Sequence, residues 1–378
     1  MTTPPRFRST VVEVDLAAVR HNIGVLKPSG SDLMAVVKAD GYGHGAVEIA
    51  RAATEGGAAW LGVALVEEGV ELRLAGLDVP ILVLSELPPG SESVALAHGL
   101  TPTACSDAGV ERLAAASRGP IGLHVKVDTG MHRIGVWPPD RTASFCDRVA
   151  QAGLIVEGVW THFAKSETDD VTTKEQLDLL LLAVEAVRAA GHEPEWVHAS
   201  NSGGVLRHPE ANLDLVRPGI ALYGLPPSPG VGTDRDLWPA LSWRSAVTFA
   251  RSLPAGERLS YGHTYELEHE AWVATVPVGY ADGYPRSLSN RADVLIRGRR
   301  CRVAGSVTMD QLIVDCGEQE IVEGDEVVLI GRQGAEMITA WELAEHLETV
   351  AYEIVTRIGK RVPRDHSVKD PETLGRKG

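Results

Sequence analysis

Short apolar runs alternate with stretches of helical spacing along the first two thirds of the chain. Eight runs have the length and composition of buried strands: residues 33–38, 60–64, 80–84, 101–105, 121–127, 154–163, 196–200 and 213–217. Alanine- and leucine-rich segments with apolar residues at helical intervals, such as residues 46–54 and 174–190, separate them. Eight strand-helix units predict a parallel (β/α)8 barrel, of the TIM type, closed by an outer ring of helices.

The pattern changes after residue 235. Short runs that alternate apolar and polar residues follow one another, with Gly, Asp and Pro turns between them and few long helices. The sequence therefore predicts an α/β protein with two domains, a barrel over residues 9–235 and a mostly β C-terminal domain over residues 236–378. Residues 1–8 are expected to associate with the β domain.

Period-two alternation in the fifth strand indicates which side chains point into the barrel. In residues 121–128 the odd positions are apolar and the even positions are glycine or polar, so the two sets lie on opposite faces. The polar set includes Lys126, and a charge inside the barrel is costly unless it is paired. The C-terminal ends of barrel strands form the active face, and Arg133 is expected within reach of it. Candidates at these ends are Lys38, Lys126, His162, Ser202 and Arg217.

Lys38 ends the first apolar run and opens a glycine-rich turn over residues 39–45. Burial would lower the pKa of its ammonium group and leave a neutral amine that can form a Schiff base. The alternative is a strand-end lysine whose amine reaches solvent. The loops after the seventh and eighth strands, at residues 201–204 and 217–220, carry glycines that expose backbone N–H groups, as phosphate sites do. Together these features indicate a phosphorylated aldehyde, pyridoxal 5'-phosphate.

Composition narrows the class of ligand. The chain has 378 residues and a net charge of -15, from 51 acidic and 36 basic residues, without a long run of either sign. Nucleic acid and anionic membranes are therefore disfavoured, and a small molecule is favoured. The four cysteines form no Cys-x-x-Cys pair, and no metal site is expected. Neither a signal-peptide core nor a run of about 20 apolar residues occurs, so a cytoplasmic location is expected.

Ten short motifs follow one another along residues 11–364, and each occurs once. They are the Lys38 strand and turn, Lys126–Arg133, Thr161–Ala164, Asn201–Gly203, Val216–Ile220, Ser260–Gly262, Gly279–Gly283, Met309–Gln311, Tyr352–Ile354 and Arg361–Arg364. With these motifs the chain resembles the bacterial alanine racemases, a family of barrel-type pyridoxal phosphate enzymes. Residue types alone do not decide the role of the tyrosines in the second domain, because tyrosine more often fills a core or an interface than acts as an acid or base.

The resemblance implies an isomerase of the EC 5.1.1.1 type that interconverts L-alanine and D-alanine with two bases on opposite faces. Lys38 would hold the cofactor and act on the D face. Tyr261 of the partner subunit would act on the L face, which implies a homodimer with shared active sites. The product D-alanine would serve peptidoglycan synthesis.

The resemblance also assigns roles to other residues. Arg217 faces the pyridine nitrogen, and because it keeps its own proton it leaves the ring a weaker electron sink. Lys126 matches a position that is carbamylated in several relatives. The remaining cofactor contacts are Tyr42, His162, Ser202, Gly219, Ile220 and Tyr352. The substrate contacts are Arg133, Met309 and Asp310, and Tyr280 and Arg286 match an entry corridor.

Other readings stay open. The nearest is a racemase that prefers serine or a broad set of amino acids, because pockets discriminate poorly against one small added group. A barrel-type amino acid decarboxylase would need an acid at the pyridine nitrogen, where Arg217 stands. A cofactor carrier would lack the β domain and Tyr261, and a D-threonine-type aldolase would need a metal site. A noncatalytic interaction protein would leave the barrel-mouth residues unexplained.

Overall fold

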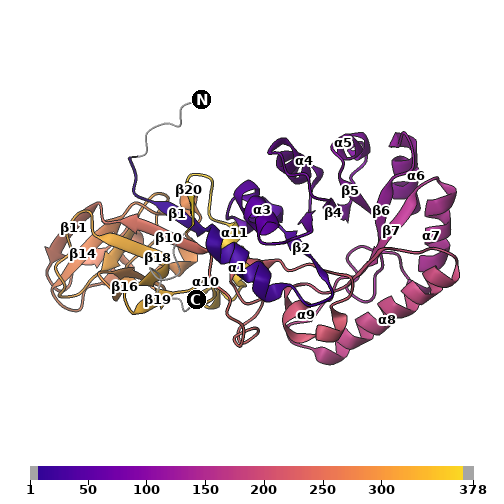
Figure 1. The fold of residues 1–378 in the computed structure, drawn as a ribbon. Helices are drawn as coiled ribbons and strands as arrows, with labels where there is room; N and C mark the ends of the chain where they lie inside the picture. Colours follow the sequence, from indigo (N-terminus) through magenta and orange to yellow (C-terminus); the bar gives the residue numbers. More distant parts are fainter. Residues whose placement is uncertain (1–6, 369–378) are drawn as a thin grey trace. The chain divides into compact units, whose positions relative to one another are not determined.

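The computed structural model describes residues 7–368, which fold into two compact units (Figure 1). The barrel unit comprises residues 18–238, and the β unit comprises residues 7–17 and 239–368. Of the segment 1–8 that was expected to join the β domain, residues 1–6 lie outside the described part. The unit boundary falls after Trp238, whose N–H donates to the side chain of buried Asn22 (2.8 Å) and so ties it to the barrel.

The first strand differs from the expected division, which gave residues 9–15 to the barrel. Strand β1 (Val11–Asp15) belongs to the β unit, where it pairs antiparallel with β10 (Leu241–Ala246) and parallel with β20 (Arg364–Ser367). Its alternation of apolar and polar residues suits either sheet. Long-range pairing with strands more than 200 residues away decides its place.

The barrel unit contains eight parallel strands, as predicted. They are β2 (Asp32–Val36), β3 (Trp60–Val63), β4 (Ile81–Glu86), β5 (Thr101–Ala104), β6 (Gly122–Lys126), β7 (Ile155–Trp160), β8 (Trp196–His198) and β9 (Leu215–Val216). The sheet order is β8-β7-β6-β5-β4-β3-β2-β9. The N–H of Asp214 donates to the carbonyl of Val197 (3.1 Å) and that of Arg217 to Ser200 (2.9 Å), so the two edges nearly close the barrel.

One helix precedes the first barrel strand and the others follow barrel strands, and they lie outside the strands in Figure 1. They are α1 (Leu16–Leu26), α3 (Ala46–Glu55), α4 (Val66–Leu74), α5 (Glu92–Ala97), α6 (Asp107–Ala116), α7 (Thr142–Gln151), α8 (Asp170–Ala189) and α9 (Ser202–Arg207). Side-chain caps start three of them, because Ser106, Asp169 and Asn201 each accept a hydrogen bond from a first-turn N–H. In α8, Leu177, Leu180, Val184 and Val187 recur at helical spacing on the buried face.

The β unit is built on one ten-stranded sheet, in line with the mostly β domain predicted. Its order is β11-β14-β17-β16-β15-β18-β10-β1-β20, and β19 pairs with β18. The further strands are β11 (Phe249–Leu253), β14 (Ala271–Val276), β15 (Asp293–Ile296), β16 (Arg299–Val303), β17 (Leu312–Asp315), β18 (Glu326–Gln333) and β19 (Glu336–Ile338). A separate pair is formed by β12 (Arg258–Leu259) and β13 (Tyr265–Glu266), and the helices are α10 (Ala340–His346) and α11 (Ala351–Thr356). Within residues 7–368, no helix has the length and apolar character to cross a membrane.

Candidate active site

Lys38 lies two residues after the end of β2, the first barrel strand. It opens α2 (Lys38–Tyr42), a single turn in which Ala39, Asp40, Gly41 and Tyr42 have φ angles of 53°, 54°, 60° and 52°. Three of these four are not glycine, and the left-handed conformation costs such residues about 1–2 kcal/mol each. Side-chain contacts therefore have to hold the turn in place.

Glu68 on α4 supplies the main contact. One of its carboxylate oxygens accepts a hydrogen bond from the N–H of Ala39 (2.7 Å), the residue after Lys38. The other oxygen accepts from the N–H groups of Ala64 (2.8 Å) and Leu65 (3.1 Å). One carboxylate thus joins the Lys38 turn to the loop that precedes α4.

The surroundings of Lys38 favour its neutral form. Its side chain is half-buried, and burial lowers the pKa of its ammonium group. The positive charge of Arg133 lowers this pKa further, whereas the negative charge of Glu68 raises it. Lys38 is therefore a better nucleophile near neutral pH than a solvated lysine.

Arg217 follows β9 directly and is 3% exposed. All of the hydrogen-bond partners of its guanidinium are neutral groups. Its guanidinium donates to the carbonyls of Thr161 (2.7 Å) and Ala199 (2.9 Å) and lies 2.7 Å from Nδ1 of His198. It also stacks over the ring of Trp160, 4.7 Å from the centroid. Burial lowers the pKa of Arg217 to about 9, so it keeps its proton at neutral pH.

A pair of buried histidines continues from Arg217 into the barrel. Nε2 of His198 lies 2.8 Å from Nδ1 of His124, and both rings are fully buried. Burial and the charge of Arg217 lower the pKa of His124 to about 3 and hold that of His198 well below its usual value. Both rings are therefore neutral, and a neutral His198 can accept a hydrogen bond from Arg217 at Nδ1 only when its own proton is on Nε2.

The charges of four cationic side chains act on His162. Burial lowers its pKa well below the usual value, and the charges of Arg217, Lys126, Arg133 and Lys38 lower it further. These five side chains therefore converge at the C-terminal ends of the barrel strands. The hydrogen bonds of Arg217 go to His198 and to two carbonyls, one of them that of Thr161.

Lys126 points into the barrel, as the alternation in its strand predicted. It is 2% exposed, and its amine lies 4.9 Å from the centroid of the Trp160 ring, which also faces Arg217. Burial, followed by the charges of Arg133 and Arg217, lowers its pKa to about 8. A substantial fraction of this amine is consequently neutral near physiological pH.

Hydroxyl and backbone donors gather at the loops after β8 and β9. The hydroxyl of Ser202 accepts hydrogen bonds from the N–H groups of Gly219 (2.9 Å) and Ala221 (3.2 Å), which joins the two loops. A Cβ atom at Gly219 would collide with the hydroxyl of Tyr42, so a larger residue there would have to displace that side chain. The Tyr42 ring packs on Tyr223 with centroids 5.0 Å apart. Hydroxyls beside a close, Cβ-free backbone are the donor set that a phosphate group needs.

The other candidate residues lie in the β unit. Tyr261 begins a 3-10 turn (Tyr261–His263), and 75% of its surface is exposed. The turn is held at its base, because Ser306 donates to the carbonyl of Tyr261 (2.9 Å) and Ser260 donates to that of Ser306 (2.6 Å). The exposed candidates also include Tyr280, Arg286, Met309 and Asp310, whereas Tyr352 on α11 is half-buried.

The sequence analysis did not single out Glu68, His124, Trp160 or His198. Three of them could have been found by extending the alternation argument, because Lys126, Trp160 and His198 are cross-strand neighbours, and so are His124 and Gly158. Glu68 follows from no pattern, since its acceptor role depends on a turn 29 residues away. No cluster of metal-ligating side chains occurs within residues 7–368.

Comparison with known proteins agrees with this geometry. The family model for the alanine racemase N-terminal domain matches residues 14–227, and that for the C-terminal domain matches residues 240–366. The chain is 50% identical over 366 residues to the alanine racemase of Symbiobacterium thermophilum, covering 95% of this chain and 97% of the relative. It is 42% identical to that of Halothermothrix orenii, covering 96% and 98%.

Solved structures give the same result. The crystal structure of alanine racemase from Streptomyces lavendulae matches with a TM-score of 0.91 and 39% identity, covering 98% of this chain and 99% of that one. The alanine racemase from Bacillus anthracis with bound L-Ala-P matches with a TM-score of 0.90 and 37% identity, covering 96% of each chain. Both domains, in order and over nearly their full length, place the chain in the alanine racemase family.

Proposed function

We propose that the protein interconverts L-alanine and D-alanine with pyridoxal 5'-phosphate as cofactor. The observation that carries the proposal is the convergence of Lys38, Lys126, Arg133 and Arg217 around His162, beside the hydroxyls and glycines of a phosphate cradle. Four neighbouring cations repel one another unless anions join them. A cofactor phosphate, a cofactor phenolate and a substrate carboxylate would supply those anions.

The residues present fit this cofactor. Lys38 would hold it covalently through its partly neutral amine, and Arg217 would face its ring nitrogen. Hydroxyl and backbone donors would hold the phosphate; they are Tyr42, Ser202, Gly219, Ile220 and Tyr352. When bound, the cofactor withdraws electrons from the α-carbon and so makes its proton more acidic.

Arg217 limits how far that withdrawal goes. Because its pKa stays near 9, it remains a donor at neutral pH and gives no proton to the ring nitrogen. His198 fixes the guanidinium through Nδ1, and His124 fixes His198 in turn. A rigid, protonated arginine at this place suits a reaction that returns the proton to the same carbon. A decarboxylase would need an acid there.

Two bases would move the α-proton. Lys38 would serve the D face, and Tyr261 of the partner subunit would serve the L face, so that the active form is a homodimer with shared active sites. The exposed position of Tyr261 on a braced turn supports a contact with another chain. Arg133 would bind the substrate carboxylate, with Met309 and Asp310 of the partner subunit completing the pocket.

Other residues would serve access and charge balance. Tyr280 and Arg286, both exposed, would line the entry corridor. Lys126 would carry a carbamate, which converts a buried cation into an anion that can pair with Arg133. The D-alanine produced would feed peptidoglycan synthesis in the cytoplasm.

The proposal is tested with purified protein, pyridoxal 5'-phosphate and each L-amino acid in turn, with the D-enantiomer measured. Alanine should give the highest kcat/KM. An equal or larger value for serine, lysine or arginine would make the protein a racemase of different or broad preference. Borohydride reduction and peptide mapping should place the cofactor on Lys38, and attachment elsewhere would contradict the assignment.

A matched pair of variants tests the two bases. Tyr261→Phe should remove racemisation, while Tyr265→Phe, a tyrosine four residues away whose hydroxyl binds Asp315 (2.8 Å), should leave it near the wild-type rate. Because each base serves one face, Tyr261→Phe should still exchange the α-proton of D-alanine with solvent deuterium. Loss of exchange from both enantiomers would contradict the two-base division.

A further inference from the structure

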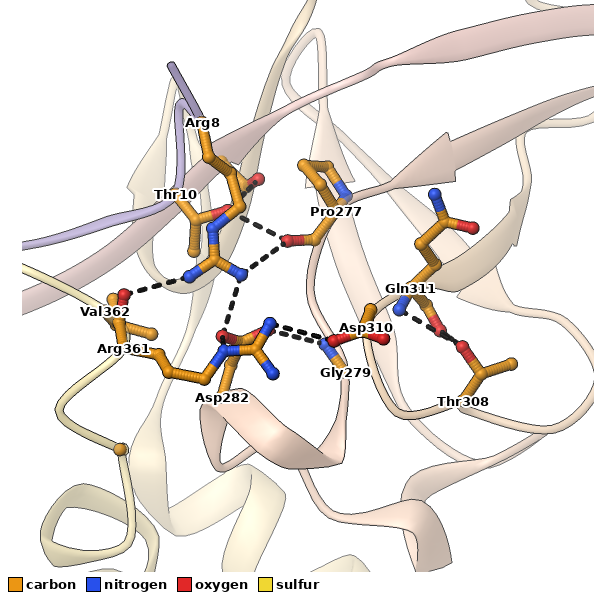
Figure 2. A network of polar contacts seen from close by, with 12 residues as sticks. Arg8, Thr10, Pro277, Gly279, Asp282, Thr308, Asp310, Gln311, Arg361 and Val362 are labelled. Carbon is orange, nitrogen blue, oxygen red and sulfur yellow. Dashed lines mark hydrogen bonds and ion pairs between the residues drawn. The ribbon is translucent and has the colours of Figure 1, made fainter. Parts of the chain in front are cut away.

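Asp282 is a buried carboxylate in the β unit, and two arginines from distant parts of the chain converge on it. Its side chain has no exposed surface. Figure 2 shows the group, which we call the Asp282 cluster: Arg8, Asp282 and Arg361. Nη1 of Arg8 lies 2.8 Å and Nε of Arg361 lies 3.4 Å from the same oxygen, Oδ1. A buried anion of this kind depends on such cations.

Arg361 is shared between two carboxylates. While its Nε faces Asp282, its Nη2 donates to Oδ1 of Asp310 at 2.8 Å (Figure 2). The planar guanidinium presents these donors in a fixed geometry. Arg361 thus links the buried Asp282 to the exposed Asp310.

Backbone hydrogen bonds join the loop that contains Asp282, residues 279–283, to the loop that contains Asp310, residues 308–311. The other oxygen of Asp282 accepts from the N–H of Gly279 (3.1 Å), at the start of the 3-10 turn Tyr280–Asp282. The N–H of Tyr280 donates to the carbonyl of Thr308 (3.0 Å), and that of Ala281 donates to Met309 (3.0 Å). A Cβ atom at Gly279 would collide with both of these carbonyls, so glycine permits the close approach.

The segment held in this way is a tight turn. The N–H of Thr308 donates to the carbonyl of Gln311 (2.9 Å), and the N–H of Gln311 donates to the Thr308 hydroxyl (3.1 Å). Met309 and Asp310 project from its tip, and Met309 is 53% exposed. The tip is fixed at two points, through backbone bonds to residues 280–281 and through Arg361.

We propose that Asp282 is a positioning residue for the substrate pocket, because it orients Arg361 and the loop 279–283 and through them fixes Met309 and Asp310. The inference rests on the proposed function, in which these two side chains complete the partner subunit's pocket. Asp282 itself touches neither substrate nor cofactor in this scheme. Its effect should therefore appear in substrate binding more than in the chemical step.

The test compares Asp282→Asn with a control that loses an exposed pair of ionic contacts elsewhere in the β unit. Arg300→Met is that control, because Arg300 bridges Glu336 (3.0 Å) and Glu342 (2.6 Å). In the intact holoenzyme, Asp282→Asn should raise KM for alanine about 10-fold while kcat changes less than about 3-fold, the split expected when ground-state and transition-state binding weaken together. Arg300→Met should change neither.

A double-mutant cycle tests the route through Arg361. Arg361→Met should raise KM in the wild-type background and change it less than about 2-fold in an Asp310→Asn background, since coupled residues are not additive. Arg361 is half-exposed, so Arg361→Met decides the question even if Asp282→Asn fails to fold. Additive effects, or a KM for Asp282→Asn within about 2-fold of wild type, would overturn the inference.

Amide exchange separates this inference from the proposed function. Asp282→Asn should speed hydrogen exchange at Tyr280, Ala281 and Thr308 by about 10-fold or more, because the bonds that protect them are loosened. Arg300→Met should not. If the wild-type protein fails to racemise alanine, the proposed function fails alone, and unchanged exchange in Asp282→Asn would overturn the positioning role.

Discussion

Replacing Glu68 with glutamine should weaken the Lys38 turn in two measurable ways. The carboxylate accepts hydrogen bonds from Ala39 through one oxygen and from Ala64 and Leu65 through the other. Glutamine has only one acceptor oxygen, so at least one of these sets is lost. A hydrogen bond to a charged group contributes about 1.5–3 kcal/mol, and we expect the free energy of unfolding to fall by about 2 kcal/mol.

The second effect is electrostatic. The negative charge of Glu68 raises the pKa of Lys38, so its removal should lower that pKa beyond the reduction already caused by burial and Arg133. Only a neutral amine attacks an aldehyde. The midpoint of the pH dependence of cofactor capture by the cofactor-free protein should therefore move to lower pH in Glu68→Gln.

The control is Glu67→Gln, which removes the same charge from the exposed neighbouring position on α4. It should change neither the unfolding free energy nor the capture midpoint appreciably. Urea unfolding and stopped-flow absorbance of cofactor capture measure the two quantities. A Glu68→Gln midpoint that is unchanged or moved to higher pH would refute the electrostatic reasoning, whatever happens to stability.

Two further predictions concern the barrel interior. With a pKa of about 8, about a tenth of Lys126 is neutral at pH 7, whereas a lysine of pKa 10.5 would be about 0.03% neutral. Addition of ¹³C-bicarbonate should therefore give a carbamate NMR signal that the Lys126→Ala variant lacks. A signal of equal strength in that variant would contradict carbamylation at Lys126. The folded-state pKa of His124, near 3, lies below its unfolded value near 6.5, so the unfolded chain binds more protons as the pH falls. Stability should therefore drop by about 2 kcal/mol between pH 7 and pH 5 through this residue, and urea unfolding of His124→Gln should show a shallower loss; equal losses would contradict it.

The sequence predicted those features that depend on one element at a time. Eight strands with intervening helices follow from local periodicity, and so does the inward direction of Lys126. Residues at the ends of successive parallel strands had to meet at one mouth, because the barrel's topology brings those ends together. The group around His162 is the result of that rule.

Features that depend on two distant segments were out of reach. A Cβ atom at Gly158 would come within 2.6 Å of the His124 ring, so this glycine makes room for the histidine on the neighbouring strand. Nothing in the strand that contains Gly158 states this requirement. The left-handed run at Ala39–Tyr42 is similar, because its non-glycine residues oppose it locally and Glu68 overrides that preference.

Asp282 and Arg217 are both charged and buried, but their charges are balanced in different ways, and the difference separates a ligand site from a structural support. Two arginines contact the same carboxylate oxygen of Asp282, so its negative charge is balanced within the protein. Arg217 is equally buried, yet its hydrogen-bond partners are a neutral histidine and two carbonyls, and the charges that it joins around His162 are all positive. Glu68 offsets part of the charge of Lys38, but positive charge around a buried arginine still costs stability until an anion enters. The barrel mouth is therefore built for a ligand, whereas the Asp282 cluster is already complete and can serve to hold other residues in place.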